Sequence, residues 1–179
     1  ASPALKPEDA QTKSNEYKKE KEKKDNRNLF LAREGIVREG TQAAIGVSKT
    51  DLQLRTNLEK RKKDMLKNLN CFISPNRLCF RNMPANVTDN ALRKLILKHV
   101  KSKTKITELR VMKDLKTGKS KGFAFVAFDK DDMALETLRS MNNNPDVFSN
   151  DQRPIIEFSI ENRKALNARQ KRLEKSKEK

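Results

Sequence analysis

The stretch that decides the fold of this chain is Lys121-Gly122-Phe123-Ala124-Phe125-Val126-Ala127-Phe128. Side chains alternate between the two faces of a β-strand. One face of this strand therefore carries a cation and two rings: Lys121, Phe123, Phe125 and Ala127. The other face holds only small or apolar side chains, which suit a core beneath two helices: Gly122, Ala124, Val126 and Phe128. Because burial of both faces would leave Lys121 unpaired, the pattern indicates a sheet with one packed face and one open face.

The segments around this strand alternate between strand and helix patterns. Three further strands are expected at 77–83, 106–112 and 155–160. Two helices are expected at 88–100, where Thr88 can cap, and at 131–141, with a turn-rich lysine loop at 114–118. The order β-α-β-β-α-β is that of an α+β, ferredoxin-like sandwich. Such a fold packs a four-stranded antiparallel sheet, here within residues 76–160, against two helices.

The flanking segments have different patterns. Residues 1–27 are charged, which predicts a disordered tail or an exposed helix. Apolar clusters punctuated by glycines at 28–47 indicate an irregular docking segment, the first part of an extension that spans 28–70. Ser48 resembles the N-cap of a helix at 49–68. Its apolar stripe is expected to pack on the neighbouring domain or on a partner: Leu54, Leu58, Met65 and Leu69. A basic helix is predicted at about 162–173, within a C-terminal segment at 161–179.

The composition is strongly basic. The 179 residues carry a formal net charge of +17, and 36% of them are charged against 35% hydrophobic. The sequence pI is about 10.0, which points to a polyanionic partner, and the charge favours nucleic acid over an anionic membrane. No stretch approaches the roughly 20 apolar residues of a membrane span. Cys71 and Cys79 are too few for a disulfide scaffold or a zinc site and suit a reducing compartment. Because the chain begins at Ala1, it is expected to be a segment of a longer protein.

Residues 121–128 fit every position of the first signature of the RNA recognition motif. Residues 76–160 therefore resemble this family. The resemblance implies that unstacked bases lie on Phe123 and Phe125, while Lys121 contacts a phosphate. The second signature is expected on the first strand, where Leu78-Cys79-Phe80-Arg81-Asn82-Met83 fits with one departure. Cys79 stands where the family usually has an aromatic ring, so one stacking surface is missing.

Further candidate RNA contacts follow from strand periodicity and charge. The side chains expected beside the rings are Cys79, Arg81, Arg110, Met112, Glu157 and Ser159. The intervening residues suit the core: Leu109, Val111, Ile156 and Phe158. Lys116 and Lys119, in the loop before the third strand, either clamp the RNA backbone or form a solvated basic loop. A redox or metal role for Cys79 is not expected, because a small thiol in place of the ring is the simpler interpretation.

A second resemblance extends beyond the domain. It is carried by Arg27 to Gly35, Gly40-Thr41, Gly46-Val47-Ser48, Asn142 to Pro145 and Arg153 to Ser159. From about Arg27 to Arg163 the chain resembles the last RNA recognition motif, with its preceding extension, of a nucleolar family that includes RNA-binding motif protein twenty-eight of animals and nucleolar protein four of yeast. The resemblance implies work in the nucleolus, within the nucleus, on large-subunit assembly and ribosomal RNA processing. The implied partners are pre-ribosomal RNA, other assembly factors or ribosomal proteins, and in animals small nuclear RNA.

The same residues bear on other functions. A protein-interaction module is the alternative, favoured by Cys79 and by a terminal helix that could fold over Phe123 and Phe125. DNA binding ranks third, because no groove-reading helix is evident. Catalysis is not expected: the sequence shows no phosphate loop, metal-ligand cluster or nucleophile arrangement, and the single histidine, His99, is expected on the surface. No cofactor or metal is predicted.

Overall fold

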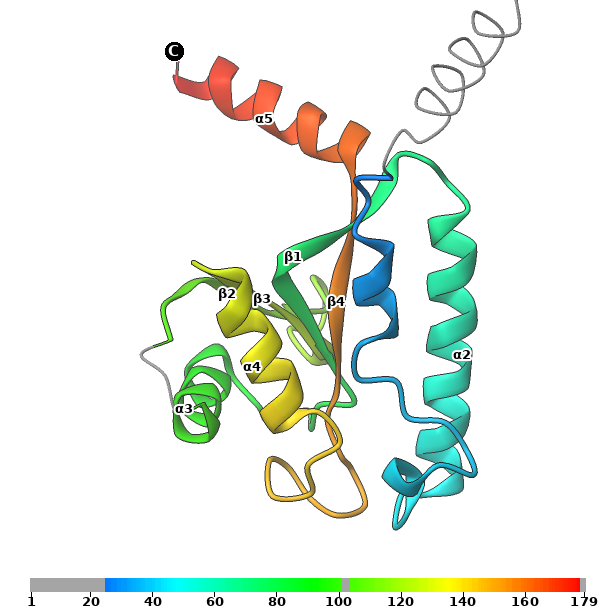
Figure 1. Ribbon diagram of the computed structural model, residues 1–179. Coiled ribbons are helices and arrows are strands. Elements are labelled where there is room, and N and C mark those ends of the chain that lie inside the picture. Colours follow the sequence, from blue (N-terminus) through cyan, green and yellow to red (C-terminus); the bar gives the residue numbers. More distant parts are fainter. Residues whose placement is uncertain (1–24, 101–103, 178–179) are drawn as a thin grey trace, which may run out of the picture.

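The computed structural model describes residues 25–100 and 104–177 (Figure 1). Its antiparallel sheet has the order β2-β3-β1-β4, with β1 at Cys71–Arg81, β2 at Ile106–Lys113, β3 at Ser120–Phe128 and β4 at Ile155–Asn162. Helices α3 (Asp89–His99) and α4 (Asp131–Met141) cover one face. The predicted ferredoxin-like α+β class is confirmed. Of the predicted charged tail, residues 1–24 lie outside the described residues.

The core lies between the sheet and helices α3 and α4. Thr88 caps α3 by accepting a hydrogen bond from the backbone N–H of Ala91, which fixes the helix start. The buried side chains alternate along the strands and recur at helical spacing on the helices, as predicted. They include Phe80, Leu92, Ile96, Val126, Phe128, Leu138 and Ile156, each at most 1% exposed. This packing turns the other face of the sheet, with Phe123 and Phe125, away from the core.

Strand β1 is longer than its sequence pattern suggested. It begins at Cys71, six residues before the expected start, and runs through Pro75. The pairing of β1 with β4 has a register irregularity between Ile73 and Leu78, and this irregularity accommodates Pro75 within the strand. The first half of β1 pairs with the end of β4, which reaches Asn162. The sheet therefore extends past the boundary predicted at residue 76, because Cys71 to Ile73 pair with the end of β4.

The N-terminal extension wraps around the β4 edge of the sheet. It contains the short helices η1 (Leu29–Arg33) and η2 (Gln42–Ala44), then α2 (Lys49–Leu66). Helix η1 contacts β1 and β4, and Leu31 belongs to the core. Helix α2 runs alongside β4 (Figure 1). Ser48 caps α2, its hydroxyl accepting from the backbone N–H of Asp51, as predicted.

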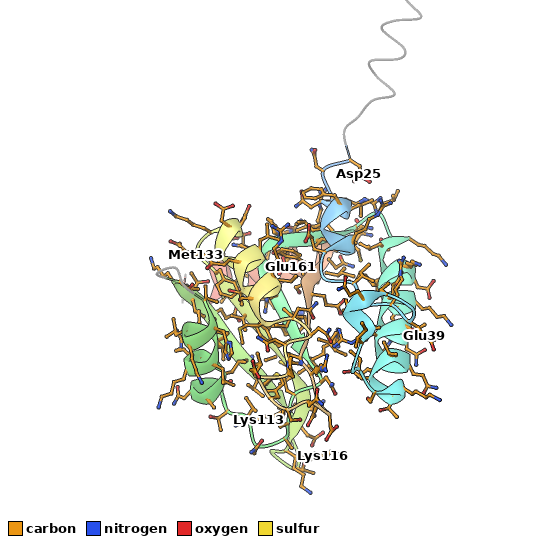
Figure 2. The ribbon with its side chains drawn as sticks, turned by 60° about the horizontal axis from the view of Figure 1, so that its bottom comes forward. Asp25, Glu39, Lys113, Lys116, Met133 and Glu161 are labelled. Carbon is orange, nitrogen blue, oxygen red and sulfur yellow. The ribbon has the colours of Figure 1, made fainter. Side chains whose placement is uncertain are left out.

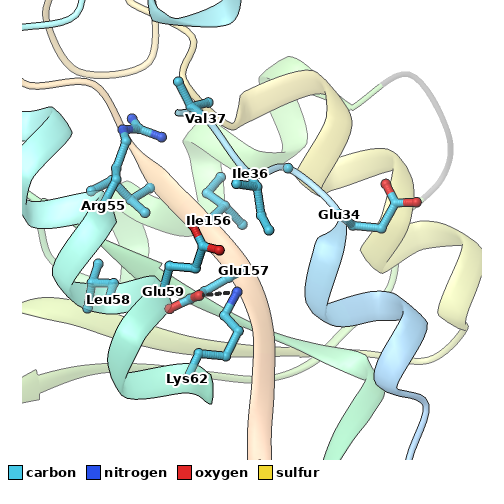
Figure 3. Close-up of a pocket in the computed structure, with 11 residues that line it drawn as sticks. Glu34, Ile36, Val37, Arg55, Leu58, Glu59, Lys62, Ile156 and Glu157 are labelled. Carbon is cyan, nitrogen blue, oxygen red and sulfur yellow. Dashed lines mark ion pairs between the residues drawn. The ribbon is translucent and has the colours of Figure 1, made fainter. Parts of the chain in front are cut away.

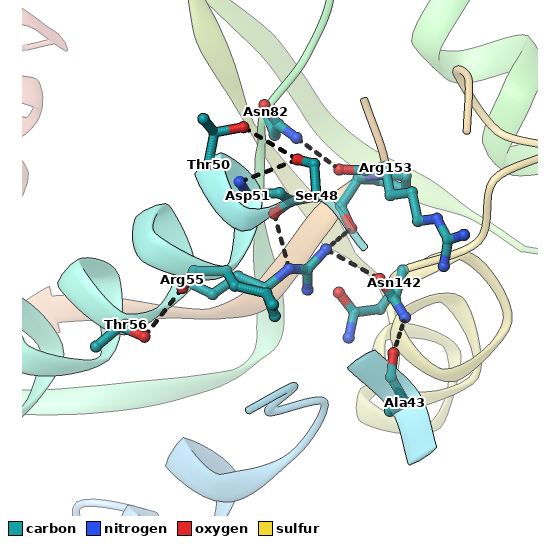
Figure 4. A network of polar contacts seen from close by, with 12 residues as sticks. Ala43, Ser48, Thr50, Asp51, Arg55, Thr56, Asn82, Asn142 and Arg153 are labelled. Atoms are coloured by element: carbon teal, nitrogen blue, oxygen red, sulfur yellow. Dashed lines mark hydrogen bonds and ion pairs between the residues drawn. The ribbon is translucent and has the colours of Figure 1, made fainter. Parts of the chain in front are cut away.

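Polar contacts dock α2 on the domain (Figure 4). Arg55, 6% exposed, donates from Nε to Asp51 Oδ1 at 2.9 Å. Its Nη2 donates to the Asn143 side chain and to the Pro154 carbonyl. Asn143 in turn donates to the Ala43 carbonyl at 2.7 Å. A buried guanidinium satisfied in this way makes the loop after α4 and the extension one structural unit.

Only part of the apolar stripe predicted for α2 faces the domain, because Leu58 and Met65 line a groove together with residues of the sheet. Leu54, Met65 and Leu69 are 38%, 50% and 75% exposed, whereas the buried residues of α2 are Asp51 and Arg55. The prediction that the stripe packs on the neighbouring domain is therefore wrong for Leu54 and Leu69, whereas half-buried Leu58 and partly exposed Met65 border the sheet across the groove. Helical spacing reveals a stripe, but hydrogen-bond partners supplied by the distant residues 143 and 154 decide which face is buried.

The C-terminal helix α5 spans Arg163–Lys177 and projects away from the sheet (Figure 1). It is longer than predicted. Its first residue, Arg163, lies 5.5 Å from the centroid of the Phe72 ring, at the start of β1. The idea that this helix covers Phe123 and Phe125 is wrong for the described residues, because those rings line a groove bordered by α2 instead.

A glycine pair tests how tightly the extension is packed. Gly35 and Gly40 both have positive φ, +70° and +80°. A Cβ on Gly35 would lie 2.8 Å from Asn142 Nδ2 and 2.9 Å from Leu138 Cδ2, whereas a Cβ on Gly40 meets nothing within 4 Å. Both Gly→Ala changes carry a conformational cost of about 1–2 kcal/mol. Gly35→Ala is expected to lose a further ~1–3 kcal/mol through overpacking.

Urea unfolding followed by circular dichroism measures this difference. Gly40→Ala is the matched control, because it shares the backbone cost without the clash. Equal losses in the two variants would show that the extension is not packed against α4 in the way described.

Candidate nucleic-acid interface

A row of side chains crosses the open face of the sheet. Strand pairing aligns Arg110 with Phe125, Phe125 with Cys79, and Cys79 with Glu157. Residues paired across antiparallel strands point to the same face. One predicted residue from each strand therefore lies in this row, which supports the predicted strand phase, including that of the flanking strands.

The two aromatic rings stand next to each other on β3. The ring centroids of Phe123 and Phe125 are 5.9 Å apart and the ring planes are perpendicular. Both side chains are half-buried, so part of each ring remains accessible. Gly122, which precedes Phe123 on β3, has a φ of +74°. A Cβ added at this position would meet only the Met83 carbonyl oxygen, at 3.5 Å. The glycine of the signature is thus required by backbone conformation more than by space.

Two arginines lie over these rings. The Arg77 guanidinium carbon is 5.0 Å from the Phe125 centroid, and that of Arg81 is 5.7 Å from the Phe123 centroid. Arg81 was predicted as an RNA contact, but Arg77 was missed. The strand period of two could have identified Arg77, because residues 77, 79 and 81 of one strand point to the same face. Arg77 also pairs with Glu161, Nη1 to Oε1, at 3.2 Å.

Glu157 joins the extension to this face. Its carboxylate is 2.6 Å from Lys62 Nζ of α2 (Figure 3). The same carboxylate is 3.1 Å from Arg81 Nε of β1. The Lys62 and Glu157 side chains are only 11% and 13% exposed. Lys62 also donates to the Ala32 carbonyl of η1 at 3.4 Å. Glu157 was predicted as an RNA contact, and its two cationic partners make it a structural anchor of the interface.

A groove separates α2 from the sheet face. Its volume is about 340 Å³, and both rings and Cys79 line it together with residues of α2. Two predicted contacts, Cys79 and Ser159, lie in this groove and are 2% and 4% exposed. The sequence predicted the face on which they lie and the existence of the helix, but not that the helix lies beside this face.

The other predicted contacts lie around the rim. Lys121, Arg110, Lys116 and Lys119 are exposed, and Met112 is half-buried. Figure 2 shows Lys113, the last residue of β2, and Lys116, in the loop between β2 and β3, at one end of the molecule. The β2–β3 loop is closed by Asp114, whose carboxylate accepts from the backbone N–H groups of Thr117 and Lys116, which lowers its pKa. The lysines of this end are therefore presented by an ordered turn.

The described residues show little that suggests other chemistry. Within 25–100 and 104–177, no group of three histidine, cysteine or acidic side chains gathers to hold a metal ion. None of the helices described combines the length and apolarity needed to cross a membrane. His99 is half-buried, so its expected surface position is corrected. A small cavity of about 30 Å³ lies beneath α2, between Arg55 and Ile156 (Figure 3).

Similarity to known proteins agrees with this geometry. Residues 79–150 match the family model of the RNA recognition motif. The chain therefore contains an RNA recognition motif domain, a class that binds RNA and is generally not enzymatic. It is 45% identical over 158 residues to RNA-binding protein 28 of Homo sapiens, covering 84% of this chain and 21% of that protein. It is 28% identical over 98 residues to the Sex-lethal homolog of Chrysomya rufifacies, covering 55% of this chain and 28% of that protein.

Solved structures resemble the chain over about half of its length. A Sex-lethal protein/RNA complex matches with 27% identity and a TM-score of 0.41, covering 49% of each chain. The second domain of yeast poly(U)-binding protein matches with 26% identity and a TM-score of 0.39, covering 47% of this chain and 93% of that one.

Cys79 should behave as an inert thiol. Burial raises its pKa from 9.0 to about 11, with Arg81 acting in the opposite direction. A raised thiol pKa means that the neutral form persists until the pH approaches that value, and only the thiolate is a nucleophile. At about pH 8 we expect iodoacetamide to leave Cys79 unmodified in the folded chain, as measured by peptide mass spectrometry.

The urea-unfolded chain is the control, in which Cys79 should react readily. Equal labelling in both states would show that the folded chain does not hold this thiol in its neutral form.

Proposed function

We propose that this chain is the RNA-binding module of a nucleolar ribosome assembly factor, acting in large-subunit biogenesis and pre-ribosomal RNA processing. The observation that carries the RNA-binding part is the partly accessible pair Phe123 and Phe125, surrounded by cations on the open face of the sheet. The nucleolar part is supported by 45% identity to human RNA-binding protein 28 and by the family resemblance from residue 27 to 163.

The proposed mechanism uses stacking for bases and charge for the backbone. Bases stack on the accessible parts of Phe123 and Phe125, and the planar guanidinium groups of Arg77 and Arg81 offer a second stacking surface. Exposed Lys121 and Arg110 lie where phosphates of a strand crossing β3 would pass.

The rings provide the direct test. Replacing both Phe123 and Phe125 by Ala should remove two stacking surfaces of about 1–3 kcal/mol each, so that affinity for single-stranded RNA falls by at least about 30-fold. Fluorescence anisotropy with pre-ribosomal RNA fragments at two salt concentrations measures this decrease. Leu115→Ala is the control, because that side chain is 99% exposed and lies off the sheet face. Affinity unchanged in the double variant would place RNA elsewhere.

The C-terminal helix offers a separate prediction. Helix α5 carries seven basic residues and one acidic residue, Glu174, and only its first turn lies near the sheet. Truncation after Asn162 should weaken RNA binding mainly at low salt. The slope of log affinity against log salt should become shallower by about 0.7 for each phosphate that the truncated chain no longer neutralises. An unchanged slope would exclude α5 from binding phosphates.

A protein-interaction role is the second candidate, and exposed apolar groups on the extension favour it. Phe30 and Ile45 are 71% and 74% exposed. A cavity of about 640 Å³ lies between η1 and α2, next to Glu59. Hydrogen bonds from Arg38 and then Lys63 lower the pKa of Glu59 to about 2, so these charges are paired within the chain. Loss of assembly-factor binding in Phe30→Ala, with RNA affinity intact, would support this role.

A further inference from the structure

The groove between α2 and the sheet is built unlike the rest of the open face. One wall is helical and carries Leu58, Arg61 and Met65, and the opposite side is formed by Cys79 and the two phenylalanine rings. Its volume, about 340 Å³, lies at the lower end of the range for small-molecule pockets, which is roughly 300–1,000 Å³. The groove is continuous with the rings on which bases are proposed to stack.

The cysteine makes room for this groove. In the resembled family an aromatic ring stands at the position of Cys79, and a base lies on top of it. Here the smaller thiol sits at the bottom of the groove, 2% exposed. The missing ring surface is replaced from the side by Met65, which is 50% exposed and polarisable, and by half-buried Leu58. A flat apolar ligand would thus meet side chains on two sides.

The charge of the lining suits an anion attached to that ligand. The lining residues include three cations, Arg61, Lys62 and Arg81, and one carboxylate, Glu157, so their net charge is +2. Lys62 and Arg81 both pair with Glu157. Arg61 is exposed and has no ion pair with any residue in the described ranges, which leaves its guanidinium available for a phosphate.

The groove is also held open. The Lys62–Glu157 ion pair fixes the distance between α2 and β4, and Arg55 anchors the other end of the helix. Helix α5 projects away and does not line the groove. A preformed site of this kind spares its ligand the cost of ordering the walls.

We propose that this groove is a nucleotide subsite of single-stranded RNA, created by the N-terminal extension. One base enters between Met65 and the Cys79–Phe125 surface, and Arg61 binds an adjacent phosphate. This inference rests on the proposed RNA-binding function and deepens it, because it makes α2 a part of the RNA site. It assigns RNA binding to a helix that lies outside the sheet.

Two matched pairs of variants test the subsite in the full chain. Arg61→Ala removes the cation at the groove, and Lys60→Ala removes an equal charge from a neighbouring residue that lines a different surface, beside Glu39 and Lys49. Met65→Glu places a carboxylate in the groove, and Leu69→Glu places one on a side chain that is 75% exposed and outside it. Circular dichroism confirms that each variant is folded.

The probe is a short random-sequence single-stranded RNA containing 4-thiouridine. We expect Met65→Glu to weaken binding by about ten-fold, the size expected when one base no longer stacks. Arg61→Ala should weaken it by about the same factor, because one charge-assisted hydrogen bond to a phosphate is lost. The two controls should stay close to the unchanged chain. Photo-cross-linking followed by mass spectrometry should place 4-thiouridine on α2 peptides around Met65, as well as on β3. Met65→Glu should remove the α2 cross-link and keep the one on β3.

The outcomes separate the subsite from the proposed function. If the Phe123 and Phe125 double variant loses RNA while both α2 variants match their controls and α2 is not cross-linked, the subsite is wrong and sheet binding stands. If the unchanged chain fails to bind the RNA, both proposals are overturned. If Met65→Glu abolishes binding of a protein partner and leaves RNA binding unchanged, the groove is a protein-binding site and the inference is overturned.

Discussion

The ion pair between Lys62 and Glu157 is the interaction on which the arrangement of the open face depends. It joins α2 to β4, and through Ala32 and Arg81 it also reaches η1 and β1. The two side chains are only 11% and 13% exposed, so the opposite charge offsets part of the cost of removing each group from water. Removing Lys62 would still leave Glu157 paired with Arg81, whereas removing Glu157 would leave Lys62 without an ion pair among the described residues, a situation that costs about 3–5 kcal/mol in comparable sites. The groove and the position of Arg81 over Phe123 both follow from this pair.

The extension is held by backbone carbonyls and asparagine side chains as much as by apolar packing. Asn28, Asn82 and Asn143 all adopt positive φ, a conformation that asparagine tolerates better than most residues. Each donates its side-chain amide to a distant carbonyl, those of Ile73, Arg153 and Ala43. The same three residues therefore adopt a backbone conformation that few residues tolerate, and their side chains connect segments that are far apart in the sequence.

Two arginines lie above the aromatic rings on the open face of the sheet, Arg77 over Phe125 and Arg81 over Phe123. Each guanidinium covers part of a ring and is paired with a glutamate, Arg77 with Glu161 and Arg81 with Glu157. In the proposed mechanism, an incoming base shares or replaces these interactions. Because a guanidinium is planar and stacks well, it would then form the second side of a stacked base. Under that mechanism, the affinity for RNA depends both on the rings and on the strength of the two glutamate pairs.

The sequence alone determined the order of strands and helices, the core positions and the face that carries Phe123 and Phe125. These features follow from local periodicity, which is set by the geometry of single strands and helices. Only the tertiary structure decided that β1 continues back through Pro75, that α2 buries Asp51 and Arg55 while exposing Met65, and that Arg77 and Arg81 lie over the rings. Each of these depends on partners far away in the sequence, such as Pro154 for Arg55 and Glu157 for Lys62. A one-dimensional pattern does not contain such pairings, because a polar side chain is buried only where the folded chain supplies its hydrogen bonds.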